Sequence, residues 1–447
     1  MALLLLKLLF FLTPLVSAMP ALLLPDAPLL PSEDPFYIPP SGWESTKPGA
    51  ILRHRVPGPI AAFGVAKVNL QSAHQILYRT TDSFGKPIAT VTTILVPHNA
   101  DYTKLLSYQA APDAADPDCS PSFAIQRESD AGEALSLLMP QLEYIFMSGA
   151  LNKGYIVAFP DHLGPKAAFL ANNLSGHAVL DNIRAALASG SFTNISPHAT
   201  VALWGYSGGS LASGFAAELQ PTYAPELNIV GAALGGTVPS IPSVIQATNK
   251  GPFAGLIPAG IQGLANEYPI AQDLIRDNIR ADKYAAFNKT QHLCFSGNIV
   301  EYLNQDMNVY FHNQDVFNGP VARELAVENN MGKATPRIPL FIYKSVNDQV
   351  SPVKDTDVLY SQYCGDGARV EYVRDLASEH ITLAVTGGPH ALLWLIDRFN
   401  GVAVKEGCSR RTQITGLTDP KAALALGRDT IKFLLGLLSL PVGPISR

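Results

Sequence analysis

The chain contains 447 residues, of which 47% are hydrophobic and 15% are charged, and its formal net charge is -5. This balance permits a large buried core and excludes an intrinsically disordered chain. The slight acidic excess provides no basic patch for nucleic acid and no polycationic arm for a membrane, so we expect no nucleic-acid binding.

The first 18 residues have the composition of a secretory signal peptide. They are rich in Leu and Phe and end in Val16-Ser17-Ala18, a small-residue pattern that suits signal peptidase. The apolar run is short for a membrane span, so we expect no stable membrane insertion. Lys7 stands inside the run, although the positive charge normally precedes it, which leaves an uncleaved anchor as the alternative.

Two further features favour the secretory pathway. Asn-X-Ser/Thr glycosylation acceptors occur at Asn173, Asn194 and Asn288. An even number of cysteines predicts two disulfides with three possible pairings. The cysteines are Cys119, Cys294, Cys364 and Cys408. Neither a Cys-X-X-Cys sequence nor a His/Cys cluster has metal-ligand spacing, so we expect no metal and no other cofactor.

The N-terminal part of the chain suggests an arm followed by strands. Residues 19–59 are rich in proline and are predicted to lie as an extended arm over the core. Strand-like runs follow at residues 66–79, 89–97 and 104–109, and the first two are expected to form a hairpin. Leu and Ile at helical spacing predict a helix over residues 131–147.

The central part alternates between strand and helix. Strands are predicted at residues 155–160, 201–204 and 229–234, and helices at 176–188 and 208–219. This alternation indicates a parallel sheet with right-handed crossovers.

The alternation stops at residues 239–336, a stretch too long for a loop, which we interpret as a helical cap inserted in the core. It resumes with strands at 339–343 and 370–373 and an amphipathic helix at 391–399, with no clear element after Cys408. The predicted core therefore comprises residues 60–238 and 337–447.

The segment Gly205-Tyr206-Ser207-Gly208-Gly209 has the G-x-S-x-G pattern of a nucleophile elbow. Such a pattern also occurs by chance, but here a strand-like run precedes it and a helix-like run follows it. In an elbow the serine occupies a strained strand-to-helix turn, and glycines are needed where the strand and the helix close on each other. The turn would hold the serine hydroxyl beside a helix N-terminus, which favours negative charge.

A nucleophilic serine needs a base within hydrogen-bond reach, and that base needs an orienting carboxylate. In α/β-hydrolases these residues follow in the order Ser, acid, His, with the acid after a late strand and the His after the last one. Asp348 lies in a polar turn after the strand at 339–343, and His380 lies on the loop after the strand at 370–373. We therefore predict Ser207, Asp348 and His380 as the catalytic triad.

Four residues are alternatives to Asp348 and His380. Asp355 and Asp357 are expected on the following helix, facing solvent, and Asp375 lies close to the loop that carries the base. His390 follows Gly387-Gly388-Pro389, a sequence typical of the start of a helix.

The oxyanion of the tetrahedral intermediate needs N–H donors placed in advance. The amide of Gly208 is the expected first donor. The second usually comes from the loop after the third strand, which here contains Pro112-Asp113 and no His-Gly-Gly-Gly sequence. Asp161-His162, at the end of another strand, either lines the pocket or forms a structural hydrogen-bonded pair.

Several segments besides the elbow together form a specific pattern. They are Ser107-Tyr-Gln109, Asp113, Asp118-Cys119, Asp161-His162, Lys166-Ala-Ala-Phe169, Tyr223-Ala-Pro-Glu-Leu-Asn-Ile-Val-Gly231, Gly235-Gly-Thr237, Gly251-Pro-Phe-Ala-Gly255 and Glu379-His380. Through them the chain resembles the fungal secretory lipases, of the yeast lipase A type, over nearly all residues after the signal.

The resemblance implies an α/β-hydrolase fold: a mostly parallel sheet with helices on both faces and an inserted helical cap acting as a lid. It implies the same triad, with Asp113 and Gly208 forming the oxyanion hole. It also implies the disulfides Cys119–Cys294 and Cys364–Cys408. One departure is Ala110-Ala-Pro112, because bulky or acidic residues commonly precede the oxyanion Asp in the family.

The same family includes fungal trichothecene C-3 esterases, which remove an acetyl group from a terpenoid. The insertion contains no Trp and no basic amphipathic helix to seat it on a lipid surface. Ala110-Ala-Pro112 also removes side-chain bulk beside the oxyanion hole. We therefore predict a secreted, monomeric serine carboxylic-ester hydrolase that deacetylates a small trichothecene-like ester, with triacylglycerol lipase as the alternative.

Two other classes share this fold. A peptidase would carry the same triad, and an assay of ester against peptide substrates distinguishes it. Non-catalytic binding proteins also occur where a triad residue is missing, but none is missing here.

Overall fold

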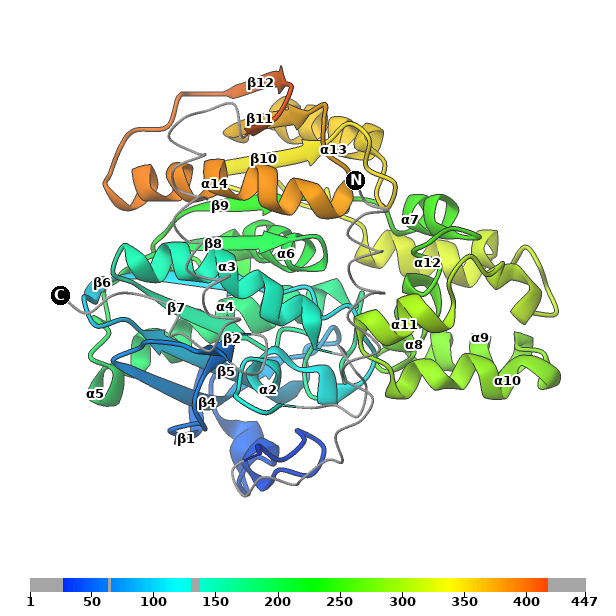
Figure 1. Cartoon of the computed structure of the whole chain (residues 1–447), viewed down its shortest axis with the longest axis horizontal. Coiled ribbons are helices and arrows are strands. Elements are labelled where there is room, and N and C mark those ends of the chain that lie inside the picture. Colours follow the sequence, from blue (N-terminus) through cyan, green and yellow to red (C-terminus); the bar gives the residue numbers. More distant parts are fainter. Residues whose placement is uncertain (1–26, 63–65, 130–136, 417–447) are drawn as a thin grey trace.

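The core of the chain is a ten-stranded sheet (Figure 1), seen in a computed structural model that describes residues 27–62, 66–129 and 137–416. Within these residues the strand order is β1-β4-β5-β7-β6-β8-β9-β10-β11-β12. The strands are β1 (Ile51–Arg55), β4 (Ser72–Thr81), β5 (Pro87–Val96), β6 (Asp101–Gln109), β7 (Tyr155–Pro160), β8 (Thr200–Tyr206), β9 (Ile229–Gly235), β10 (Leu340–Ser345), β11 (Val370–Asp375) and β12 (Cys408–Gln413). The predicted signal peptide, residues 1–18, lies outside the described residues, as does the start of the helix predicted over 131–147.

The sheet is mostly parallel, as predicted. The strands from β7 to β12 pair in parallel, whereas β4 pairs antiparallel with both β1 and β5, and β5 pairs antiparallel with β7. Every residue of β7 and of β10 is buried. Parallel strands of this kind require cover on both faces.

Helices provide that cover. α4 (Asn172–Ala188), α6 (Gly208–Tyr223) and α13 (Val353–Gly365) pack on one face, where Leu180, Phe215 and Leu359 join one apolar cluster with the strands. α3 (Leu138–Asn152) and α14 (His380–Phe399) pack on the other face, where Tyr144 and Trp394 join a second cluster. The predicted layers of helix, sheet and helix are therefore present.

Between β9 and β10 the chain leaves the sheet and forms a cap of helices. They are α7 (Ile241–Thr248), α8 (Leu256–Ala265), α9 (Pro269–Asn278), α10 (Ala281–Asn288), α11 (Phe295–Glu301) and α12 (Pro320–Asn329), with short 3-10 turns between them. In Figure 1 these helices lie beyond the ends of β8, β9 and β10. Phe287, Tyr302 and Phe311 are buried in an apolar cluster of the cap itself. Among the described residues, no helix combines the length and the apolar character needed to cross a membrane.

β12 lies where the sequence predicted no element. Most of its side chains are exposed, because it forms the edge of the sheet and pairs only with β11. An exposed edge strand lacks the apolar pattern by which strands are recognised in a sequence. The disulfide between Cys408 and Cys364 of α13 ties this strand to the core.

α14 begins at His380 and continues through Gly387-Gly388-Pro389, so the prediction of a helix start near Ala391 was wrong. The two glycines let the helix approach its neighbours closely. A Cβ at Gly387 would lie 2.5 Å from the Tyr343 ring, and one at Gly388 would lie 2.6 Å from the Phe146 ring. Close packing therefore outweighs the low helix propensity of this stretch.

The N-terminal arm is less extended than predicted. Residues 27–59 contain 3-10 turns at Pro35–Tyr37 and Trp43–Ser45, and β1, which adds to the edge of the sheet beside β4. The single strand predicted at 66–79 is divided, because Ala66–Lys67 forms β3 and pairs with β2 (Ala61–Ala62), and β4 begins at Ser72.

Candidate active site

Ser207 lies at the sharp turn between β8 and α6 and has a φ of 51°, in the left-handed region. A Cβ at Gly205 would collide with the Gly209 carbonyl, and a Cβ at Gly209 would collide with the Gln109 carbonyl of β6. Glycine is therefore required at both positions, as expected for an elbow. The Ser207 N–H donates to the Gly235 carbonyl at 2.9 Å, which fixes the turn to the end of β9.

The structure brings Ser207, His380 and Asp348 into one hydrogen-bonded chain. Ser207 Oγ lies 2.8 Å from His380 Nε2, and His380 Nδ1 lies 2.7 Å from Asp348 Oδ2. This geometry favours the tautomer in which Nδ1–H donates to the carboxylate and Nε2 accepts from the serine. All three residues are largely buried, with whole-residue exposed fractions of 9%, 5% and 8%.

The Asp348 carboxylate is an ionised hydrogen-bond acceptor. Its Oδ1 accepts from the backbone N–H groups of Val350 and Ser351 at 2.9 and 2.8 Å. Burial opposes ionisation, but the charges and hydrogen bonds of His380 and Lys344 outweigh burial and hold the pKa of Asp348 well below its ordinary value. The carboxylate thus keeps its charge throughout the range in which a histidine titrates.

The sequence predicted His380 on a loop, but in the structure it is the first residue of α14. Its N–H donates to Gln349 Oε1 at 3.0 Å, and its carbonyl accepts from the Tyr206 hydroxyl. Glu379 caps the helix through a reciprocal pair of hydrogen bonds with Thr382. Both the strand before Ser207 and the turn at Asp348 therefore help to place the imidazole.

The alternative residues lie elsewhere. Asp355 and Asp357 are half-buried on α13. Asp375 accepts from the N–H and the hydroxyl of Ser378 at 3.0 and 2.7 Å, so it shapes the loop that precedes the base. His390 lies on α14 ten residues beyond His380, which is about 15 Å along the helix axis.

Asp113 lies in the loop after β6 with a φ of 41°, directly against Gly208. A Cβ at Gly208 would lie 2.0 Å from Asp113 Oδ1, so a side chain at position 208 would displace the Asp113 carboxyl. Gly208 begins α6, and the first N–H groups of a helix have no acceptor within the helix. Burial raises the pKa of the Asp113 carboxyl to about 7, so at weakly acidic pH it adds no negative charge beside Ser207.

The loop that carries Asp113 is held by buried groups behind it. Glu143 of α3, which the sequence analysis did not single out, accepts from the Ala111 N–H and the Tyr108 hydroxyl, both at 2.9 Å. Burial raises the pKa of Glu143 to about 8. Glu143 is the lone acidic residue of the apolar stretch 137–147, and this was the available signal.

His162 also holds this loop, and Asp161 holds the short helix Pro121–Ala124 that follows it. The Asp161 carboxylate accepts from the Ser122 N–H at 2.7 Å and from its hydroxyl at 2.5 Å. His162 Nε2–H donates to the Ala110 carbonyl at 2.7 Å, and burial lowers the pKa of His162 to about 4, so the ring is neutral. Of the two interpretations left open by the sequence, the structure favours the hydrogen-bonded structural one.

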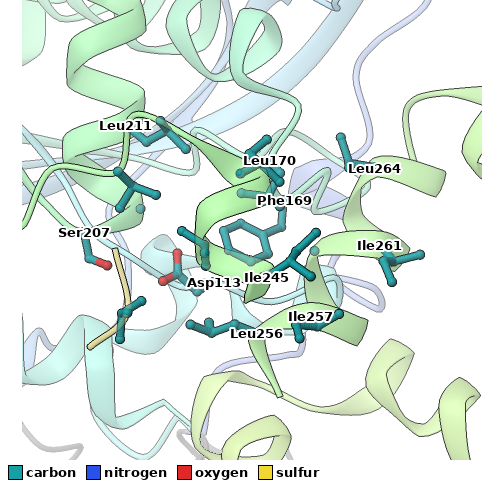
Figure 2. A pocket seen from close by; sticks show the side chains of 16 residues that line it. Asp113, Phe169, Leu170, Ser207, Leu211, Ile245, Leu256, Ile257, Ile261 and Leu264 are labelled. Carbon is teal, nitrogen blue, oxygen red and sulfur yellow. The ribbon is translucent and has the colours of Figure 1, made fainter. Parts of the chain in front are cut away.

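An apolar pocket begins at Ser207 and Asp113 and runs into the cap (Figure 2). Phe169, Leu170 and Leu211 form its wall on the core side. On the cap side it is lined by aliphatic residues of α7 and α8: Ile241, Val244, Ile245, Leu256, Ile257, Ile261 and Leu264. Ser207 and Asp113 supply the polar side chains of the lining, so the pocket suits a hydrocarbon group attached to a reacting carbonyl.

Comparisons with known proteins point to one family. Residues 129–407 match the model of the family described as secretory lipase. Lipase A of Arthroderma benhamiae is 46% identical over 449 residues, which cover 98% of this chain and 95% of the relative. Lipase 5 of Candida albicans is 39% identical, covering 93% of this chain and 91% of the relative.

The chain belongs to the secretory lipase family. The resemblance noted in the sequence is thus confirmed. The X-ray structure of Candida antarctica lipase A in its closed state has a TM-score of 0.80 and 30% identity, and the match covers 94% of this chain and all of that one. The fold is therefore that of an α/β-hydrolase, and the protein is a serine carboxylic-ester hydrolase.

Both disulfides implied by the resemblance are present. Cys119 bonds to Cys294 and Cys364 bonds to Cys408. Cys119 follows the loop that carries Asp113, and Cys294 precedes α11 of the cap. The first bond therefore joins the segment after the Asp113 loop to the cap. Among the described residues, no group of three or more His, Cys, Asp or Glu is placed to hold a metal ion.

We predict that Ser207→Ala and His380→Ala each lower kcat by roughly 10⁴- to 10⁶-fold, and that the double variant loses little more, because residues that act as one unit show non-additive effects. Steady-state kinetics on a soluble ester measures this. An organophosphonate should label Ser207, as found by peptide mass spectrometry. Additive losses, or labelling of another serine, would contradict the assignment.

We predict that removing the Cys119–Cys294 bond by Ala at both positions lowers the free energy of unfolding by about 2–5 kcal/mol and also lowers kcat, because the oxyanion loop loses its tie to the cap. The double Ala variant at Cys364 and Cys408 is the matched control. It should lose stability but keep kcat, because its bond lies at the sheet edge. Equal kcat values in the two variants would contradict the proposed coupling. Denaturant unfolding and kinetics measure both quantities.

Proposed function

We propose that this secretory lipase hydrolyses carboxylic esters of medium- to long-chain fatty acids through an acyl-enzyme, with triacylglycerol as the substrate class. The observation that carries the proposal is the apolar pocket that leads from Ser207 into the cap. The names of the relatives, Lipase A and Lipase 5, support a lipid ester as the substrate.

In the proposed acylation step Ser207 Oγ attacks the ester carbonyl carbon while its proton moves to His380 Nε2, 2.8 Å away. Asp348 holds the ring and stabilises the imidazolium that forms. The carbonyl oxygen becomes an oxyanion, which accepts from the backbone N–H groups of Gly208 and Asp113. The bond to the alcohol oxygen then breaks, and the imidazolium protonates the leaving alcohol.

Deacylation repeats these steps with water. The water oxygen attacks the acyl carbon while His380 Nε2 takes up a proton from the water molecule. The bond from the acyl carbon to Ser207 Oγ then breaks, and the imidazolium returns the proton to the serine. The fatty acid then leaves. At weakly acidic pH the raised pKa of Asp113 supports both oxyanion steps, because a neutral carboxyl beside the oxyanion does not repel it.

The pocket favours the acyl group of a fatty acid over an acetyl group. An acetyl group would leave the aliphatic side chains of α7 and α8 without contacts to the substrate. Each CH₂ group that moves from water into an apolar site contributes about 0.8 kcal/mol. Ala110, Ala111 and Pro112 do not belong to the pocket lining, and Ala110 and Ala111 are fully buried. The small residues before Asp113 therefore do not widen the pocket.

Deacetylation of a trichothecene-like terpenoid, which the sequence favoured, is the second candidate. It was supported by the lack of Trp in the cap and by the small residues before Asp113. The arrangement of the pocket supports the lipid ester better, because its aliphatic lining continues from Ser207 along α7 and α8.

We further propose that the protein is a secreted monomer whose first 18 residues are removed. Two disulfides support an oxidising compartment.

A glycan needs an exposed asparagine because of its bulk. Asn194 is exposed at the end of a helical turn, whereas Asn173 is half-buried on α4 and donates to Glu328. Asn288 is half-buried, and Thr290 of its acceptor sequence is fully buried.

We predict that kcat/KM for 4-nitrophenyl esters rises by roughly tenfold from acetate to octanoate, since each added CH₂ enters the apolar pocket. Gly260→Val should remove most of this rise and leave the acetate rate unchanged, because Gly260 lines the pocket and a Cβ there would lie 2.6 Å from Leu170. Gly365→Val is the matched control, because a Cβ at Gly365 meets no atom within 4 Å.

The same assay distinguishes the second candidate. Activity on an acetylated trichothecene that exceeds activity on octanoate and tributyrin, with saturation below the solubility limit, would contradict the lipid-ester proposal. An equal loss of octanoate activity in both glycine variants would show that the pocket does not hold the acyl chain.

We predict that N-glycosidase treatment in heavy-oxygen water converts Asn194 to labelled Asp in most molecules and leaves Asn173 unlabelled. Peptide mapping of the secreted protein measures both sites. Full occupancy of Asn173 would contradict the placement of its side chain against Glu328. The same map should show Met19 as the first residue.

A further inference from the structure

β10 carries a lysine whose side chain has no exposed surface. Lys344 Nζ donates to the Thr237 carbonyl at 2.7 Å and lies 2.9 Å from Asp348 Oδ2. The ammonium and the carboxylate side chains are both 0% exposed. Burying an ammonium group is costly unless it is paired, and here a carboxylate and a carbonyl provide the partners.

The ammonium shares one carboxylate oxygen with the imidazole. Asp348 Oδ2 contacts both Lys344 Nζ, at 2.9 Å, and His380 Nδ1, at 2.7 Å. The positive charge of Lys344 therefore lies close to the ring that takes up the serine proton. In a low-dielectric site, an ammonium separated from the imidazole by a single carboxylate oxygen acts strongly on the charge of the ring.

Orientation of Asp348 does not depend on Lys344 alone. Without the lysine, the carboxylate would still accept from the N–H groups of Val350 and Ser351 and from His380 Nδ1. The contribution specific to the lysine is therefore its charge. That positive charge offsets the negative charge of Asp348. It therefore makes the imidazolium form of His380 less favourable.

The other charged groups near Lys344 are few. Asp348 on the turn after β10 and Asp355 on α13 act to raise the lysine pKa, whereas burial, the largest effect, lowers it. His380 on α14 faces the ammonium across Asp348 Oδ2, and the loop after β9 contributes the neutral Thr237 carbonyl. Asp355 is half-buried, so it compensates the ammonium only in part.

We propose that Lys344 is a positioning residue that sets the acidic limit of activity, by opposing protonation of the His380 imidazole while it holds Asp348. The proposal rests on the triad of the proposed function. Its consequence is an ester hydrolase that keeps a neutral, proton-accepting imidazole at lower pH than the same site would with an uncharged residue at position 344.

The test is the pH profile of kcat/KM on a soluble short-chain ester with the full chain. Lys344→Met and Lys344→Gln should move the acidic limb upward by about one pH unit, because both remove the charge. Gln keeps a donor to Asp348, so its plateau rate should exceed that of Met. Lys344→Arg keeps the charge, so its acidic limb should fall at the same pH as that of the wild type.

Asp355→Asn should shift the acidic limb of the pH profile in the opposite direction. It removes a negative charge near the ammonium, so the limb should move downward, by less than one pH unit because Asp355 is half-exposed. This variant keeps the proposal testable if the substitutions of Lys344 prevent folding, which thermal unfolding would reveal. An acidic limb that coincides with wild type in folded Met and Gln variants, or in Asp355→Asn when those do not fold, would overturn the proposal.

Ser207→Ala and His380→Ala are measured on the same ester. If these two variants retain activity, the triad itself is wrong. If they lose activity while the limb stays fixed in the Lys344 variants, the triad stands and the role of Lys344 fails.

Discussion

The close approach of the elbow to the end of β6 is the constraint on which the site depends. Gly209 lies against the Gln109 carbonyl, and any Cβ there would collide with it. The approach keeps Ser207 at a φ of 51°, a conformation that costs a residue with a side chain about 1–3 kcal/mol. Since β6 continues into the loop of Asp113, the same contact sets Asp113 against Gly208. Ser207 and Asp113 are thus placed by one packing requirement.

Buried carboxylates then fix the loops that carry the functional groups. Glu143 holds the N–H of Ala111, Asp161 holds Ser122, and Asp375 holds Ser378 just before His380. Glu143 and Asp161 reach residues that lie 32 and 39 positions away in the chain, whereas Asp375 fixes the loop that directly follows its own strand. A buried carboxyl without such donors would be strongly unfavourable, so these contacts resist displacement of the loops. Preorganised loops of this kind let N–H donors act without rearrangement during the reaction.

The sequence predicted the parts of the molecule that depend on local patterns. The elbow at Ser207, the alternation of strands and helices, and the order of Asp348 and His380 follow from residue types at short spacing. It did not predict β12 or the start of α14, because an edge strand lacks an apolar pattern and the glycines of α14 serve contacts with Tyr343 and Phe146. Glu143 and Lys344 were missed for a related reason. Their roles arise from tertiary contacts with Ala111 and Asp348, which no periodicity encodes.

A disulfide links the cap to the segment that follows the Asp113 loop. The Cys119–Cys294 bond joins them, and the apolar pocket has its reacting end at Asp113 and Ser207 and its far side on α8. An acyl chain that fills the pocket therefore contacts the same body that carries the Asp113 amide. Binding energy from the hydrocarbon chain, remote from the reacting carbonyl, can then act on the geometry of the oxyanion hole. If the pocket holds the acyl chain as proposed, we expect longer acyl groups to raise kcat as well as lower KM, so that the choice of substrate and the rate of the chemical step depend on one another.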